Sequence, residues 1–402
     1  MTVDTDVLIA GAGPVGLALA TFLGRAGVRS QVVDQRLTPT PRDESRAITW
    51  MPEGLLAADQ MGITDALGAL SVVRRWHEFR SRPGGTALLT LDMSRLPHRH
   101  PYTFNLPQSD TEGVLASAAV GTGAVTVRRG WRITSAATKA STAVEARLEG
   151  ADGQFERVAA KFGVGCDGAG SSRHGVAAML GIDEDFSDYG ASSVVADVEL
   201  AADPAPTDRS WIALSAERPI GVFCFGERRW RLVYRVNDGE SAEEVTSDDF
   251  VAGQLRRALP DADLVRHLWA STFRLGQGQS HRYWRDRWAL AGDAAHAMGP
   301  SAGAGMQLGV LGAWRLSRHL LAGLADESSW PQEAARYECE QRHAAQLVQR
   351  SNARIFRSLT VRSPVLSAVR SVALSLAGRI GPAADRMTAD AGLVGLAPDP
   401  GR

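Results

Sequence analysis

Residues 6–16 read DVLIAGAGPVG, a short apolar run followed by three glycines in the spacing GxGxxG. The run is typical of a buried parallel strand, and the residues from Pro14 onward favour a helix. In such a strand–turn–helix unit, Gly11 permits the tight turn, Gly13 lets a pyrophosphate approach the backbone, and Gly16 allows helix and strand to pack closely. The stretch therefore predicts a Rossmann-like unit that binds the phosphates of a dinucleotide at the helix start.

A second strand is expected over residues 30–33, and it ends at Asp34, about twenty residues after the glycines. A carboxylate in this place accepts hydrogen bonds from ribose hydroxyls and repels a 2′-phosphate, so the site should hold FAD or NAD rather than NADP. GxGxxG alone also occurs in glycine-rich turns without a ligand, but the strand, helix and acid around it favour dinucleotide binding. The residues expected to complete this adenosine end are Pro14, Val15, Gln35 and Arg36.

The bulk composition is that of a globular protein. The chain has 402 residues, of which 22% are charged and 44% hydrophobic, and this length suits two interleaved domains. The net charge of −1 at pH 7 gives no electrostatic reason to expect a nucleic-acid partner. Three scattered cysteines show neither disulfide nor zinc spacing, so no metal site is expected and a cytoplasmic location is favoured. The uncharged run over residues 7–23 is short and interrupted by glycines, so we interpret it as folded protein and expect no transmembrane segment.

Near residue 300 the chain carries very few large side chains. Residues 290–309 read LAGDAAHAMGPSAGAGMQLG, in which a carboxylate, Asp293, is surrounded almost entirely by glycine and alanine. Either two backbones pack closely here or a large ligand lies against the main chain. Three shorter stretches also place polar residues at expected strand or helix ends. They are SRA with Arg46, LPQ with Gln108, and CDGAGSSR with Asp167.

Together, these five motifs resemble the single-component FAD-dependent aromatic hydroxylases, which include para-hydroxybenzoate and polyketide hydroxylases. The resemblance spans residues 5–325 and implies a non-covalent FAD. It places Arg46 and Gln108 at the phosphate and ribityl portions, Asp167 near the ribose and the nicotinamide route, and Asp293 on the ribityl chain. The other residues that it implies around the flavin are Gly292, Pro300, Gly303, Gly305, Met306 and Gln307.

The chain departs from the family pattern in several places. Gly170 stands where an arginine is frequent, Arg173 comes one position early, and Gly312-Ala313 replaces the usual Asp-Ala. Gln307 replaces the customary asparagine. Because the flavin contact implied there is made by main-chain N–H groups and the helix dipole, the side chain at 307 need not be asparagine.

The resemblance also implies the chemistry. NADPH or NADH would reduce the flavin, and oxygen would then give a flavin hydroperoxide that hydroxylates an aromatic or polyketide-like small molecule. Alternatives are Baeyer–Villiger oxidation or epoxidation on the same scaffold, or a homologue that binds FAD without turnover. A flavin halogenase is disfavoured because the chain lacks WxWxIP. His98, His100 and Tyr234 are candidates for a base that deprotonates a phenol, and no catalytic residue is assigned.

The predicted fold class is α/β, with a Rossmann-like FAD-binding domain interleaved with a mainly β substrate domain, followed by C-terminal helices. Alternating residues over 220–236 predict a hairpin that turns at 226–229. Ser363-Pro364 predicts a helix start whose apolar face is solvated rather than membrane-bound. The expected assembly is a monomer or homodimer. The predicted boundaries are 1–75, 100–182 and 275–330 for the FAD-binding domain, 76–99 and 183–274 for the substrate domain, and 331–402 for the helical segment.

Overall fold

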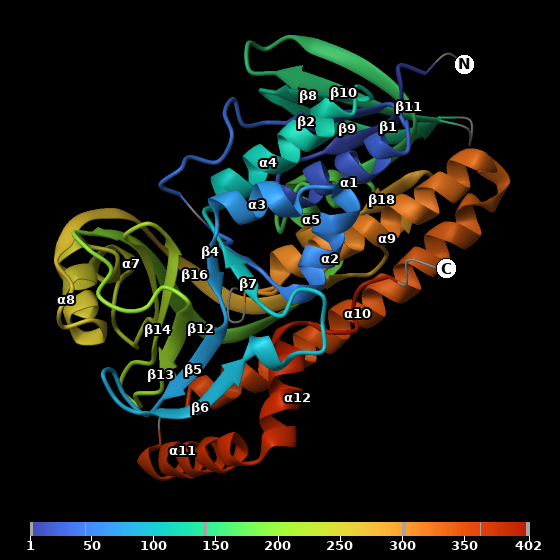
Figure 1. Ribbon diagram of the computed structural model, residues 1–402. Helices are drawn as coiled ribbons and strands as arrows, with labels where there is room; N and C mark the ends of the chain where they lie inside the picture. The colour runs from blue at the N-terminus through green and yellow to red at the C-terminus, as the bar shows by residue number, and fades with distance from the viewer. Residues whose placement is uncertain (1–2, 45, 140–142, 300–302, 362, 399–402) are drawn as a thin grey trace.

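The strand β1 (Thr5–Ala10) lies at the centre of a sheet built mainly from parallel strands. Its residues Val7, Leu8 and Ile9 are fully buried, as expected for a parallel strand covered on both faces. The computed structural model describes residues 3–44, 46–139, 143–299, 303–361 and 363–398 (Figure 1). The sheet has the order β17-β18-β11-β1-β2-β8, with β10 and β9 continuing from β11. Its other strands are β2 (Ser30–Asp34), β8 (Val125–Arg129), β9 (Trp131–Lys139), β10 (Ala143–Gly150), β11 (Phe155–Gly165), β17 (Trp284–Arg285) and β18 (Trp288–Leu290).

The helix α1 (Pro14–Arg25) follows β1 directly, so the predicted strand–turn–helix unit is confirmed. It packs against α4 (Gln108–Gly121) and α9 (Gly305–Ala325). The helix α2 (Pro52–Met61) ends at Gly62, whose φ of 72° is the left-handed conformation that glycine adopts without strain. α3 (Thr64–Leu70) follows and completes this group of helices.

A second, seven-stranded sheet lies beside the first, on the left of Figure 1. The predicted hairpin is confirmed as β14 and β15, which pair antiparallel around a two-residue turn. On the outer face, α8 (Asp248–Ala258) buries Val251 and Leu255 against Trp230 and Tyr234. The strands in order are β16 (Leu264–Ser280), β12 (Glu184–Leu200), β15 (Arg229–Arg235), β14 (Ile220–Gly226), β13 (Arg209–Ala213), β5 (Trp76–Arg80) and β6 (Ala87–Asp92).

A small three-stranded sheet joins the two large ones. It consists of β3 (Thr49–Trp50), β7 (Thr103–Asn105) and β4 (Val72–Arg74), with β7 in the middle. The Asn105 side chain donates from Nδ2 to the Cys224 carbonyl oxygen of β14 at 2.8 Å, which ties the small sheet to the seven-stranded one. The predicted fold class is confirmed. The domain boundaries given above stay a prediction.

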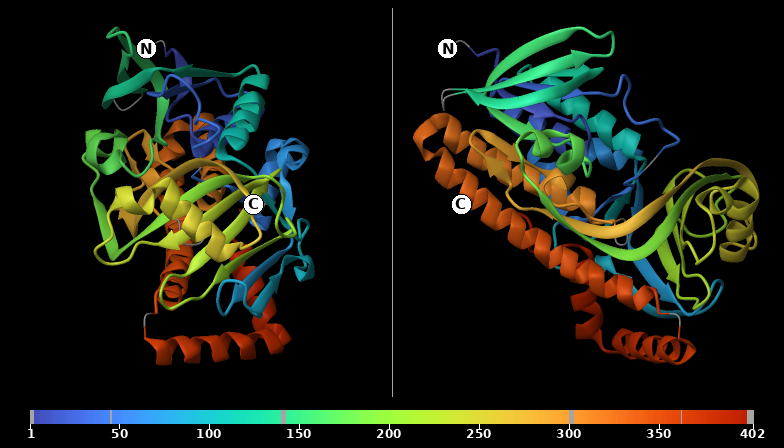
Figure 2. Two further views of the ribbon diagram at one scale, coloured as in Figure 1. Left: turned by 90° about the vertical axis from the view of Figure 1, so that its left-hand side faces the viewer. Right: turned by 180° about the vertical axis from the view of Figure 1, so that it is seen from behind.

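The C-terminal part is helical, beginning at α10 (Trp330–Leu359), α11 (Pro364–Arg379) and α12 (Gly381–Ala391). Figure 2 shows α10 running past both large sheets, with α11 lying beyond its end. The apolar side chains of Val365, Val369 and Val372 on α11 are 59–71% exposed, so the apolar face of this helix is solvated in the chain alone. None of the helices in the described residues is both long and apolar enough to span a bilayer.

Candidate active site

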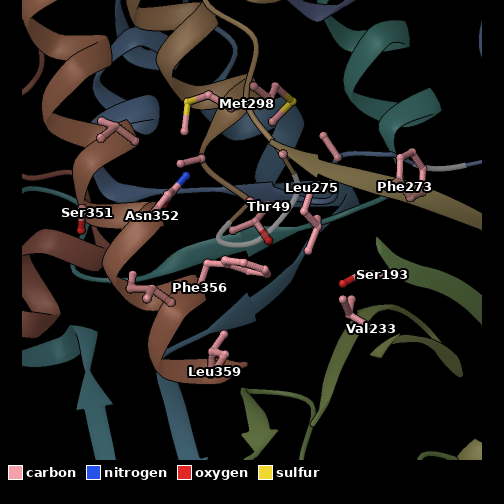
Figure 3. Close-up of a pocket in the computed structure, with 18 of the residues that line it drawn as sticks. Thr49, Ser193, Val233, Phe273, Leu275, Met298, Ser351, Asn352, Phe356 and Leu359 are labelled. Carbon is pink, nitrogen blue, oxygen red and sulfur yellow. The ribbon is translucent and has the colours of Figure 1, made fainter. Parts of the chain in front are cut away.

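A large cleft of about 1870 Å³ opens between the first turn of α9, the seven-stranded sheet and α10. Typical sites for one small molecule measure roughly 300–1,000 Å³, so this cleft has room for more than one ligand. Figure 3 shows Phe356 and Leu359 of α10 on one side and Ser193 and Val233 of the sheet on the other. Of the predicted cofactor residues, those that line it are Arg46, Asp293, Gly303, Gly305 and Met306.

The glycine turn lies outside this lining, at the start of α1. Gly11 has a φ of 105°, and a Cβ there would collide with the backbone of Cys166, so the turn requires glycine. A Cβ at Gly13 would meet nothing within 4 Å, so open space lies in front of it. No side chain caps the helix, which leaves its first N–H groups free for a phosphate. Pro14 and Val15 begin this helix, and Gly16 packs against the Gly11 backbone.

Asp34, at the end of β2, is hydrogen-bonded to the glycine turn. Its carboxylate accepts the Ala12 N–H at 2.7 Å and the Arg36 N–H at 2.8 Å. A carboxylate has about four acceptor positions, so two bonds to the main chain leave capacity for ribose hydroxyls. Gln35 is exposed between these residues.

The loop that carries Arg46 is held from two sides. Gln108, at the start of α4, accepts the N–H of Ala47 at 2.9 Å through Oε1. Arg231 of β15 donates to the Arg46 carbonyl oxygen at 3.1 Å. The Arg46 guanidinium is 66% exposed and pairs with Glu44 at 3.3 Å, so it is free to turn toward an anionic ligand in the cleft.

Asp167 has a structural partner that the sequence did not indicate. Its Oδ2 accepts the Val176 N–H at 2.7 Å at the start of α6 (Val176–Met179). Its Oδ1 is buried with no hydrogen-bond partner in the described part of the chain, and burial raises the pKa of the carboxyl group. Asp167 does not line the cleft.

Asp293 lies in the short 3₁₀ helix η2 (Gly292–Ala294), beside the start of α9. Within the described residues no donor bonds its carboxylate. Burial, followed by the charge of Glu184, raises its pKa to about 6, and Arg46 opposes this rise. The first turn of α9 also lacks a side-chain cap. An unpaired carboxylate beside free helix N–H groups fits the hydroxyls of a ribityl chain and the electron-rich edge of a flavin.

Gln307 is fully buried and does not line the cleft. Its Nε2 donates to the Thr49 carbonyl oxygen at 2.8 Å, and its Oε1 accepts the Met51 N–H at 3.2 Å. The side chain therefore ties α9 to β3 and to the start of α2, and only its main chain is available to a cofactor. Gly292 has a φ of 63° and packs against Val15, whereas Pro300 lies outside the described residues.

The three base candidates from the sequence all have partners. His100 pairs with Asp59 at 2.7 Å, and His98 lies 3.9 Å from Glu53, away from the cleft lining. The Tyr234 hydroxyl donates to the Val245 carbonyl oxygen at 2.7 Å, and burial raises its pKa. Among the described residues, no three His, Cys, Asp or Glu side chains come together as a metal site.

Comparison with known families decides the cofactor. The family model described as "FAD binding domain" matches residues 4–351. The chain belongs to this family. FAD is thus its cofactor, and the glycine turn, Asp293 and the uncapped start of α9 fit it.

Two curated relatives from Streptomyces rimosus match most of this chain. A 6-methylpretetramide 4-monooxygenase is 34% identical over 78% of the chain and 55% of its own length. A 12-dehydrotetracycline 5-monooxygenase/anhydrotetracycline 6-monooxygenase is 32% identical over 85% of the chain and 67% of its own length. The chain thus spans about half to two thirds of these relatives. A solved p-nitrophenol 4-monooxygenase from Pseudomonas putida has a TM-score of 0.88 at 24% identity, covering 98% of this chain and 99% of that one, and it shares the fold.

Proposed function

We propose that the protein is an FAD-dependent monooxygenase that uses NADPH or NADH and molecular oxygen to hydroxylate an aromatic or polyketide-like small molecule. The observation that carries this proposal is the composition of the cleft. One end has Asp293 and the free N–H groups of α9, and the walls carry apolar side chains such as Phe273 and Phe356. The two tetracycline-type relatives are named for monooxygenation of polycyclic molecules, which supports the same substrate class.

The chain's residues would hold FAD along this path. Gly11–Gly16 with Asp34 would bind the adenosine end, Arg46 and Gln108 the phosphate region, and Asp293 the ribityl chain. Bound FAD, once reduced, supplies the activation of oxygen. The apolar walls would hold the substrate ring and keep water away from the reacting atoms. The remaining residues proposed for the cofactor are Pro14, Val15, Gln35, Arg36, Asp167, Gly292, Pro300, Gly303, Gly305, Met306 and Gln307.

The test starts with the cofactor. The purified protein should be yellow and should release FAD on denaturation. It should oxidise NADPH or NADH slowly alone and faster with an accepted aromatic compound, and an atom of isotopically labelled oxygen should enter the product. Label found only in peroxide or water across a broad phenol and polyketide panel would contradict the hydroxylase proposal. Product structures would separate hydroxylation from Baeyer–Villiger oxidation and epoxidation.

We also propose a cytoplasmic location and a monomeric or homodimeric state. The location is supported by Cys166, Cys224 and Cys339, which are all free thiols. Sedimentation at micromolar concentration would settle the assembly, and a tetramer would contradict it.

A further inference from the structure

Arg74, the last residue of β4, is a buried cation in the wall of the cleft. Only 7% of the residue is exposed. Its Nε donates to Thr103 Oγ1 at 2.8 Å, and its Nη1 donates to Ser210 Oγ at 2.7 Å. In the described part of the chain no carboxylate pairs with it, and burial alone lowers its pKa to about 10. A buried charge without a counter-ion destabilises the folded protein, so the presence of Arg74 here points to a role in binding.

His77, three residues later on β5, presents a second donor at the same place. Arg74 Nη1, which can only donate, also lies 3.3 Å from His77 Nδ1, so Nδ1 carries no proton and accepts from the Ser210 hydroxyl at 2.7 Å. Nδ1 is therefore an acceptor, and the ring proton is on Nε2. Burial and then the charge of Arg74 lower the His77 pKa to about 3, which keeps the ring neutral. No described residue accepts from Nε2, and His77 lines the cleft.

The surroundings of this pair are aromatic. The Phe223 ring stacks on His77 with centroids 6.0 Å apart and an interplanar angle of 16°. Phe79 meets His77 edge-on, with centroids 5.2 Å apart. Both phenylalanines line the cleft. A ligand held here thus meets a cation and an N–H donor at one point, and flat apolar surface around them.

We propose that Arg74 and His77 bind an anionic oxygen of the substrate, either a carboxylate or an ionised phenol, on an aromatic molecule that lies against Phe223. This inference rests on the proposed function and specifies its substrate class as acidic. Ser210 is a positioning residue, because its hydroxyl orients Arg74 and sets the tautomer of His77.

The small sheet sets how far this anchor lies from the flavin end. Val72 on β4 pairs with Asn105, which pairs with Thr49 on β3, and Gln307 of α9 holds the Thr49 carbonyl oxygen. Neighbouring strands lie about 4.8 Å apart, so Arg74 is on the order of 10 Å from the strand beside the first turn of α9. That spacing suits a substrate of more than one ring, anchored at its acidic end.

The experiment compares 2-naphthoate with 2-naphthamide, which have similar shapes and differ in charge. Each is titrated into the FAD-loaded protein, and binding is followed by flavin fluorescence. We expect the acid to bind on the order of tenfold more tightly, since charge-assisted hydrogen bonds are the stronger ones. Arg74→Met should abolish this preference, and His77→Phe should weaken the acid while sparing the amide. The control Arg80→Met should keep the preference for the acid over the amide, because Arg80 pairs with Glu78 outside the cleft lining.

Thermal unfolding separates a binding role from a structural one. Because Arg74 has no counter-ion, Arg74→Met should unfold at the same or a higher temperature. A lower unfolding temperature with equal loss of acid and amide binding would instead make Arg74 a structural residue. Titrating 2-naphthol below and above its own pKa tells whether an ionised phenol is also accepted.

Equal binding of acid and amide by the unaltered protein would overturn the acidic-substrate inference, even if that protein oxygenates other compounds. Failure of the proposed function is a separate outcome. A colourless protein that rejects FAD would contradict the function, and calorimetry would still measure the acid against the amide.

Discussion

At the residue scale, Asp293, the proposed partner of the ribityl chain, costs the FAD-free folded protein stability at neutral pH. Its pKa is raised from 3.8 to about 6, so the folded state binds the proton more tightly than the unfolded state does. The contribution of Asp293 to the free energy of unfolding is therefore greatest below pH 4 and is lost as the pH rises through about 6. About two pKa units correspond to about 3 kcal/mol.

The corresponding prediction concerns Asp293→Asn in the FAD-free protein. Above pH 6 this variant should be more stable than the unaltered protein by up to about 3 kcal/mol, with the gap closing toward pH 4. It should also bind FAD more weakly by about 1–3 kcal/mol, since a charged acceptor is lost. Urea unfolding across this pH range and FAD titration measure both. Asp261→Asn on the surface is the control, and a gap that does not change with pH would contradict the prediction.

Gln307 carries the second prediction at this scale. Gln307→Asn shortens the side chain by one methylene, so it no longer reaches both Thr49 and Met51. Leaving these two buried groups unpaired should cost about 2–6 kcal/mol in the free energy of unfolding, at about 1–3 kcal/mol each. Gln307→Glu keeps the length but replaces the donor by an acceptor that faces the Thr49 carbonyl oxygen and buries a carboxylate, so it should cost at least as much. Urea unfolding compares the three proteins. An asparagine variant of unaltered stability would show that the hydrogen bonds of Gln307 to Thr49 and Met51 do not stabilise the folded protein.

Some of these residues could be identified from the sequence, and others could not. Asp34 and Asp293 were recognised because each follows a strand within a local glycine-rich pattern. The side-chain role of Gln307 was missed because its partners are 256 and 258 residues away. Arg74 was missed for the same reason, since Ser210 is 136 residues away and nothing beside Arg74 distinguishes it from a surface arginine. The assignment of the cofactor-binding side chains themselves stays a prediction.

At the element scale, β12 and β15 are joined by a buried ion pair. Arg231 donates to Asp197 through two nitrogens at 2.7 and 2.8 Å, and both side chains are at most 5% exposed. Arg231 also holds the Arg46 carbonyl oxygen, so this pair links the seven-stranded sheet to the cofactor loop. Local alternation predicted the β14–β15 hairpin, whereas this cross-strand pair depends on a register that the sequence does not reveal.

The prediction for this pair is strong non-additivity. Asp197→Leu or Arg231→Met alone leaves one buried charge without its partner and should cost about 3–5 kcal/mol. The double variant removes both charges and should recover most of that loss, because a buried ion pair is seldom more stable than apolar packing. A double-mutant cycle by urea unfolding measures the coupling. Additive losses would mean that the two side chains act independently.

At the scale of the whole molecule, the cleft is shared between structures distant in sequence. The turn at Asp293 and the start of α9 form one side, the seven-stranded sheet a second, and α10 a third. Local patterns in the sequence predicted the strand–turn–helix unit and the hairpin, and the family resemblance implied the β-sheet of the substrate domain. The sequence did not reveal the cleft, because α10 lines it through residues such as Phe356, which reads as part of an ordinary amphipathic helix.

The shared cleft predicts that FAD and an acidic aromatic ligand bind with positive coupling. The flavin would supply one wall for the ligand ring, and each molecule would bury apolar surface of the other. FAD affinity measured with saturating 2-naphthoate should therefore rise, and 2-naphthoate affinity should rise by the same factor when FAD is present, since coupling free energies are reciprocal. Factors of about 5 to 150 are typical of such coupling. Arg74→Met should lower the affinity for 2-naphthoate with and without FAD and leave the affinity for FAD alone unchanged, because Arg74 is on the order of 10 Å from β3, the strand beside the first turn of α9. Competition, in which 2-naphthoate displaces FAD, would show instead that the two ligands occupy the same part of the cleft.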